Sequence, residues 1–128
     1  MRDNEFWLHL IMAKTQFKNF RSFYQYYLTE HKNPVSRNLH FIGTALVIIF
    51  LIVGIISGQW VLFIIIPLSG YGFAWFGHYF FEKNKPATFQ YPFYSLLSDF
   101  VMFWHILTGQ LNHKLKEAEA LQNANAIK

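Results

Sequence analysis

The sequence predicts an all-α integral membrane protein: a helical bundle of about three apolar spans, at residues 39–57, 60–81 and 94–111, preceded by an amphipathic helix. The 44 residues from Asn38 to Phe81 contain no Asp, Glu, Lys or Arg. At a rise of about 1.5 Å per residue, this run is roughly twice as long as one helix needs to cross a hydrocarbon core of about 30 Å. The composition agrees, because charged residues make up 14% of the chain, against about a quarter in soluble domains.

The chain as a whole is short, apolar and basic. Its 128 residues favour one membrane domain, residues 1–128, with a polar C-terminal tail at 112–128 that we expect to form a solvated helix. The sequence contains no cysteine, which excludes disulfides, cysteine-ligated metal centres and thiol catalysis. The net charge of +4 favours contact with anionic lipid headgroups over contact with nucleic acid.

The first predicted element is an amphipathic helix over residues 5–29. Aromatic side chains recur on one face at intervals of three and four residues, and basic side chains occupy the other. Such a helix either lies in the membrane interface or docks against the spans. Pro34 separates it from the first span, and we expect Ser36 or Asn38 to cap the helix that follows.

The first two spans are predicted to form a hairpin. Ser57-Gly58-Gln59 interrupts the apolar run near its middle and supplies the turn between them. Beyond Pro86, residues 87–112 carry a single charge, Asp99. This stretch predicts an aromatic loop followed by the third apolar helix.

The basic residues predict how the hairpin is oriented. Lys32, Arg37, Lys83 and Lys85 flank its open end, whereas the turn carries no charge. Cytoplasmic loops are enriched in Lys and Arg, so the open end should face the cytoplasm. The expected location is a bacterial inner membrane or the endoplasmic reticulum.

Three histidines are predicted to meet at this open end. His40 follows Arg37 by three residues, and His78 precedes Glu82 by four, so an antiparallel hairpin places both imidazoles at nearly the same depth. His31 lies just upstream. Three imidazoles with a carboxylate from Glu82 suit either Fe(II) or Zn(II). The alternative is structural: each histidine caps a helix, reaches the headgroups or hydrogen-bonds a neighbour.

Two further residues are candidates for the chemistry. Asp99 is an ionisable residue in an apolar segment, where such residues face the interior and serve function or a buried pairing. It could bind the metal or cap a helix, but we favour a role in orienting a ligand histidine. Arg37 could pair with a substrate carboxylate or act as a boundary anchor. His105 is predicted to be structural.

Three blocks of sequence carry a family resemblance and occur in order over about residues 20–111. They are Tyr27-x-x-x-His31-x-Asn33-Pro34-x-x-Arg37-x-x-His40-x-x-Gly43, Gly77-His78-x-x-x-Glu82-Lys83-Asn84-x-Pro86-Ala87-Thr88, and Tyr94-Ser95-Leu96-Leu97-Ser98-Asp99. Together they resemble the signature of a small membrane-protein family, formerly a domain of unknown function, that includes the fungal 2-hydroxy fatty acid dioxygenase. The resemblance implies that His31, His40 and His78 bind iron.

The resemblance also implies a reaction. It predicts an Fe(II)-dependent dioxygenase that uses O₂ to shorten a long-chain 2-hydroxy fatty acid by one carbon (α-oxidation) at the membrane surface. The expected partners are this lipid substrate, O₂ and the surrounding membrane lipids, with no nucleic acid. Two alternatives remain open: a non-catalytic lipid-binding membrane module and a zinc-dependent lipid hydrolase.

Overall fold

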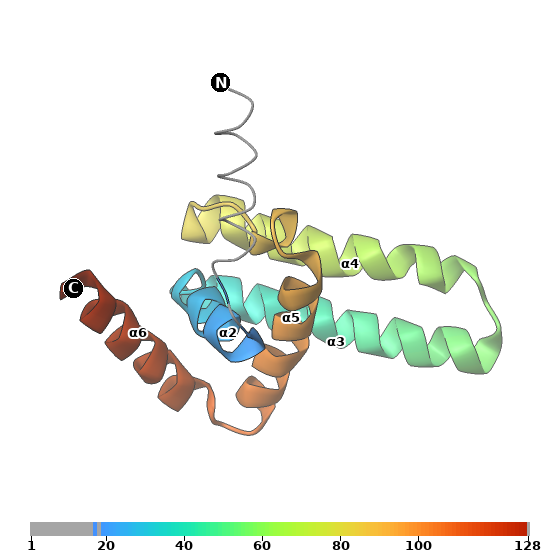
Figure 1. The fold of residues 1–128 in the computed structure, drawn as a ribbon. Coiled ribbons are helices and arrows are strands. Elements are labelled where there is room, and N and C mark those ends of the chain that lie inside the picture. Colours follow the sequence, from blue (N-terminus) through green and yellow to red (C-terminus); the bar gives the residue numbers. More distant parts are fainter. Residues whose placement is uncertain (1–16, 18, 128) are drawn as a thin grey trace.

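The computed structural model describes residue 17 and residues 19–127, which form helices joined by short loops (Figure 1). In chain order the elements are α2 (Phe20–Thr29), α3 (Pro34–Ser57), α4 (Val61–Gly77), a π-helical turn (His78–Glu82), a 3-10 turn (Ala87–Phe89), α5 (Pro92–Leu107) and α6 (Leu111–Ile127). The described residues contain no strand, which confirms the predicted all-α class.

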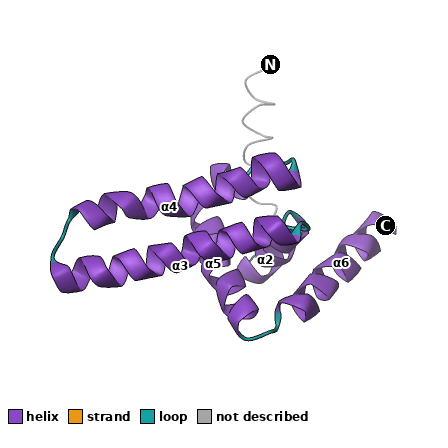
Figure 2. Cartoon of the chain, turned by 180° about the vertical axis from the view of Figure 1, so that it is seen from behind, coloured by secondary structure: helices purple, strands orange, loops and turns teal. Residues whose placement is uncertain are grey.

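Helices α3 and α4 form the predicted hairpin and lie side by side in both views (Figures 1 and 2). Gly58 ends α3 in the left-handed conformation, with a φ of 69°, which glycine adopts without steric cost. Two segments are long and apolar enough to cross a membrane, Pro34–Ser57 and Val61–Glu82, and only 22% and 17% of their most apolar windows are buried. The hairpin therefore presents its apolar side chains outward, unlike the core helices of soluble proteins.

Helix α3 begins earlier than the predicted Leu39, and neither Ser36 nor Asn38 caps it. Its cap is Asn33, whose side chain accepts a hydrogen bond of 2.8 Å from the backbone N–H of Val35. Pro34 then occupies the first helical position. There its fixed φ suits the helix and its missing N–H costs nothing.

Within the described residues, the structure offers two candidate spans, fewer than the three predicted. Helix α5 has 16 residues, or about 24 Å of length, which falls short of a hydrocarbon core of about 30 Å. It starts at Pro92 and is followed by Gly109, whose φ is 73°. Instead of running beside the hairpin, α5 crosses it near its open end (Figure 1) and packs on α2 and α3.

Helices α2, α5 and α6 share a small buried core at this end of the molecule. Its buried members are Phe23, Tyr24, Tyr27, Leu28, Met102 and Ala118. The predicted N-terminal amphipathic helix is thus present as α2 and is docked, while residues 5–16 and 18 of that prediction lie outside the described residues. The C-terminal tail forms the predicted helix, α6, but it packs against α2 through Ala118 rather than standing free in solvent.

Candidate metal centre

Three histidines from three segments converge at the open end of the hairpin. His31 follows α2, His40 lies in the second turn of α3, and His78 opens the π-helical turn after α4. Their exposed fractions are 1%, 4% and 2%. Each offers one nitrogen to a group in which all three atoms lie within 4.8 Å of one another, so the three side chains could hold one metal ion.

The Nε2 atoms face one another at distances that suit a shared metal. His31 Nε2 is 3.1 Å from His40 Nε2, which is 3.3 Å from His78 Nε2. Two imidazole nitrogens bound to one metal at about 2.1 Å, with an angle of 90–109° between them, lie about 3.0–3.4 Å apart. Both of these pairs therefore already have the spacing of ligands in a coordination shell.

The opposite ring nitrogens determine where the protons lie. His31 Nδ1 is 2.6 Å from the carbonyl oxygen of Tyr27, His40 Nδ1 is 3.2 Å from Asp99 Oδ1, and His78 Nδ1 is 2.6 Å from Asn84 Oδ1. All three partners are acceptors, so each Nδ1 must carry the proton and donate it. In neutral rings, three Nε2 lone pairs then point at one another, and only a cation can satisfy all three.

Asn84 orients His78, a role that the sequence does not predict. Its amide nitrogen donates to the carbonyl oxygen of Glu30 at 3.0 Å and to Glu30 Oε2 at 2.8 Å, which leaves Oδ1 directed at the imidazole. The backbone reaches this position through Lys83, whose φ of 58° is left-handed. The N–H of Asn84 then donates to the carbonyl oxygen of His78 at 3.1 Å.

Tyr27 supports the other two histidines. Its ring stacks on His31, with centroids 4.0 Å apart, and its backbone carbonyl accepts from His31 Nδ1. Its hydroxyl donates to Asp99 Oδ1, the same oxygen that accepts from His40. Burial raises the pKa of Tyr27 well above its usual value, and the charge of Asp99 raises it further, so the hydroxyl remains a donor.

The environment of His31 favours the neutral imidazole that a metal requires. Burial lowers the pKa of His31 well below its usual value, because the charged ring would lose its hydration. The neighbouring rings of His40 and His78 lower this pKa further, since charges on them would repel a charge on His31. The ring of His31 therefore tends to stay unprotonated at Nε2 while the other two rings are close.

Glu82 and Arg37 act on the loop that carries His31. Glu82 Oε1 accepts a hydrogen bond of 2.8 Å from the backbone N–H of Asn33 and lies outside the three-histidine group. Arg37 Nη1 donates to the carbonyl oxygens of His31 and Lys32, at 2.8 Å each. In the structure both side chains thus fix the segment between α2 and α3.

His105 also lies outside the three-histidine group. Its Nδ1 is 2.7 Å from the hydroxyl oxygen of Tyr24, which joins α5 to α2. Burial lowers the pKa of His105, and the charge of Lys114 lowers it further. The neutral ring can therefore accept the hydrogen bond from Tyr24.

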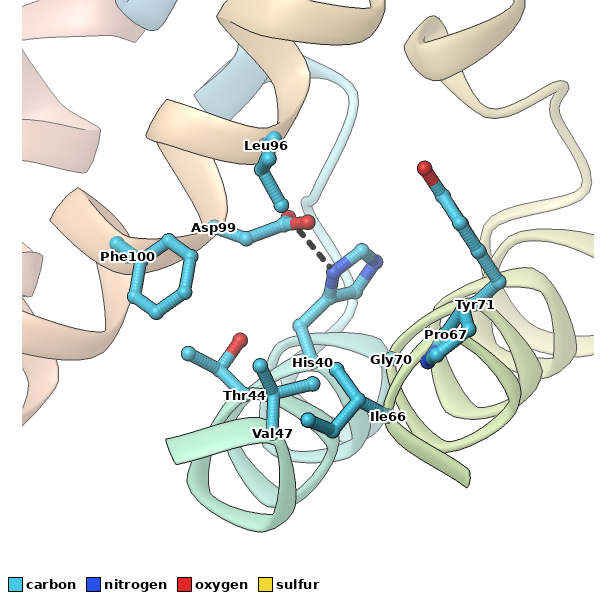
Figure 3. Close-up of a pocket in the computed structure, with 10 residues that line it drawn as sticks. All are labelled: His40, Thr44, Val47, Ile66, Pro67, Gly70, Tyr71, Leu96, Asp99 and Phe100. Carbon is cyan, nitrogen blue, oxygen red and sulfur yellow. Dashed lines mark hydrogen bonds and ion pairs between the residues drawn. The ribbon is translucent and has the colours of Figure 1, made fainter. Parts of the chain in front are cut away.

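Two spaces adjoin the cluster. A small cavity of about 20 Å³ is large enough for a water-sized molecule; among its lining residues are His40, His78, Asp99 and Ser95. The hydroxyl of Ser95 is buried without a hydrogen-bond partner among the described residues. A larger cleft also reaches His40 and Asp99 (Figure 3). The cluster is thus closed by protein on its Nδ1 side and has space beside it.

Comparison with known proteins gives a family for this site. A family model described as 2-hydroxy-palmitic acid dioxygenase Mpo1-like matches residues 17–111, a range that contains all three histidines and the acceptors that orient them. No curated protein and no solved structure matches the chain. The match confirms the resemblance found in the three sequence blocks: the chain belongs to the 2-hydroxy-palmitic acid dioxygenase Mpo1-like family.

Proposed function

We propose that the protein is an Fe(II)-dependent dioxygenase that shortens a long-chain 2-hydroxy fatty acid by one carbon at a membrane surface. The observation that carries the proposal is the convergence of three buried Nε2 atoms whose rings all donate from Nδ1. A metal ion placed among them would accept all three Nε2 lone pairs at once. Membership of a family named for a dioxygenase supports iron over zinc.

The proposed ligands are His31, His40 and His78. Three imidazoles on one side of a metal leave its other positions open, as non-haem iron oxygenases require. Bound Fe(II) would supply the redox chemistry with O₂ that no side chain provides. Tyr27, Asp99 and Asn84 hold the rings in the orientation and tautomer that binding needs.

The overall reaction balances without another oxidant. A 2-hydroxy acid, RCH(OH)CO₂H, and one O₂ give the shortened acid RCO₂H, one CO₂ and one water. The bond between the carboxyl carbon and the hydroxyl-bearing carbon breaks, and the latter becomes the new carboxyl carbon. Because no reductant is consumed, the site needs only the lipid and O₂.

The membrane placement follows from the same hairpin. We infer that α3 and α4 cross the bilayer with their outward-facing apolar side chains in contact with lipid. The histidines then lie near one headgroup layer, where the carboxylate and hydroxyl of a fatty acid also lie. The basic residues at this end favour the cytoplasmic face, in a bacterial inner membrane or the endoplasmic reticulum.

Metal content tests the proposal directly. Detergent-purified protein should contain about one iron per chain and should consume O₂ with 2-hydroxypalmitate. His78→Ala should lose both properties, because two imidazoles remain. His113→Ala is the matched control: the side chain of His113 is 75% exposed and forms an ion pair with Glu117 in the next turn, so this variant should keep iron and activity.

Other outcomes point to other functions. Full iron content in a folded His78→Ala protein would contradict the ligand assignment. Stoichiometric zinc without O₂ consumption would favour a lipid hydrolase. A folded, metal-free wild-type protein would favour a non-catalytic lipid-binding module. Helical content measured by circular dichroism shows in each case whether the variant is folded.

A further inference from the structure

A cleft leads from the histidine cluster toward the turn of the hairpin. It has a volume of about 170 Å³ and lies over α3, between α4 and α5 (Figure 3). His40 and Asp99 form its end at the cluster. The other lining residues are Thr44, Val47, Ile66, Pro67, Gly70, Tyr71, Leu96 and Phe100.

The packing of the helices explains why this space is open. Helices α4 and α5 both pack on α3, but they make little contact with each other. Gly70 lets α4 pack closely on α3, because a Cβ atom there would lie 3.2 Å from Val47 Cγ2. The cleft is therefore a consequence of the way in which α4 and α5 pack on different parts of α3.

The lining changes from polar to apolar along the cleft. At one end are the imidazole of His40 and the carboxylate of Asp99, joined by their hydrogen bond (Figure 3). Beyond Thr44 the lining consists of aliphatic and aromatic side chains. Tyr71 and Leu96 are 44% and 51% exposed, so the cleft also opens sideways on the outer surface of the molecule.

We propose that this cleft binds the acyl chain of the substrate, with the carboxyl and hydroxyl groups at His40 and the chain running along α3 past Val47. This inference rests on the proposed function. It is supported by the continuity between the cleft and the cluster, because His40 and Asp99 belong to both. The apolar path that leads away from the metal ligands matches the alkyl chain of a fatty acid.

The length of the cleft determines how much of the acyl chain it can hold. His40 and Val47 are seven residues apart on α3, or about 10.5 Å. An extended chain advances about 1.2 Å per bond, so the cleft accommodates about nine carbons. The rest of a 16-carbon chain leaves through the open side into the surrounding lipid. Affinity should therefore rise with chain length up to about nine carbons and change little for longer chains.

Two substitutions in α4 test the cleft. Ile66→Phe narrows it at the end far from the metal. Leu68→Phe adds the same ring two residues along, where the side chain is 69% exposed and borders a different hollow beside Leu39 and Phe76. Ile66→Phe should raise KM for 2-hydroxypalmitate about tenfold and leave KM for an eight-carbon 2-hydroxy acid unchanged. Leu68→Phe should change neither value.

A crosslinking measurement tests the cleft without turnover. A 16-carbon 2-hydroxy acid with a photoreactive diazirine at its ninth carbon should label the wild-type protein at Val47, Ile66 or Phe100, as mapped by mass spectrometry. Ile66→Phe should reduce this labelling severalfold, and Leu68→Phe should not. Labelling confined to Leu39 or Phe76, or equal labelling of both variants, would overturn the proposal.

The two measurements separate this inference from the proposed function. If 2-hydroxypalmitate is oxidised but the probe does not label the cleft, the acyl-chain path is wrong and the dioxygenase remains. If the probe labels the cleft but no O₂ is consumed, the acyl-chain site is supported and the proposed dioxygenase activity is contradicted.

Discussion

At the level of single residues, the candidate site depends on three hydrogen-bond acceptors, each of which orients one histidine ring. A backbone carbonyl, a carboxylate and a side-chain amide each hold one Nδ1–H. The first two cannot donate, so they fix the tautomers of His31 and His40 outright. The amide of Asn84 could present either of its ends to His78, and its contacts with Glu30 select the oxygen.

Replacing Asn84 should therefore weaken metal binding without removing a ligand. In Asn84→Ala, His78 loses the acceptor that keeps its proton on Nδ1, and the metal affinity should fall about 10–100-fold. Competition with a chelator of known affinity measures this change. Asn84→Asp keeps an acceptor oxygen and should restore most of the affinity.

Asn38→Ala is the control for this prediction. Asn38 lies exposed in α3, half a turn before His40, and its removal should leave metal affinity unchanged. Equal affinity in Asn84→Ala and wild type would show that packing alone orients His78. The role of Asn84 as a positioning residue would then be wrong.

The residues of the cluster could be predicted to different degrees from the sequence. The proximity of His40 and His78 can be predicted from their depth, because an antiparallel hairpin brings together positions that are equally far from its open end. Asn84 could not be predicted in this way, because it lies six residues after His78 and reaches it only through the π-helical turn and the left-handed Lys83. Neither feature has a periodic signature in the sequence.

At the level of elements, the crossing of α3 and α4 brings the site together. A Cβ atom on Gly77 would lie 2.9 Å from Ser36 Oγ and 3.3 Å from Ser36 Cα, so the helix backbones approach closely there. His40 is one turn beyond Ser36, and His78 is adjacent to Gly77. The contact between two small residues thus sets the separation of two histidines.

Gly77→Ala should consequently disturb both stability and the site. Overpacking at such a contact costs about 1–3 kcal/mol, and the displaced helix should move His78 away from His40 and weaken metal binding. Thermal unfolding in detergent and chelator competition measure the two effects. Gly72→Ala, where nothing lies within 4 Å of the added Cβ, should instead stabilise the helix by about 0.5–1 kcal/mol. Equal melting temperatures in the two variants would contradict the close contact.

Composition alone predicts the hairpin. It does not show how the third apolar helix packs, because that depends on the neighbouring helices. The hairpin follows from 44 uncharged residues around Gly58. Residues 94–111 are similarly apolar, yet α5 buries Ser95, Ser98 and Met102 against neighbouring helices and stops at Leu107. Hydropathy cannot distinguish a helix that faces lipid from one whose apolar side faces α2 and α3.

At the level of the whole molecule, the number of spans fixes which side of the membrane each end occupies. With the two candidate spans of the hairpin, Lys32 before it and Lys116 in α6 lie on the same side, and Gln59 in the turn lies on the other. If α5 also crossed, Lys116 would lie on the side of Gln59. The arrangement matters for function, because α2, α5 and the hairpin must meet at one surface to enclose the histidines.

Single cysteines can decide between these arrangements, because the chain contains no cysteine of its own. Lys32→Cys, Gln59→Cys and Lys116→Cys each place one thiol at an exposed position. In sealed inside-out vesicles, a membrane-impermeant maleimide should label the first and third and should label Gln59→Cys only after detergent is added. This labelling pattern is expected if the histidine cluster lies on the cytoplasmic side. Right-side-out vesicles should give the opposite pattern. Labelling of Lys116→Cys together with Gln59→Cys would mean that α5 crosses the bilayer.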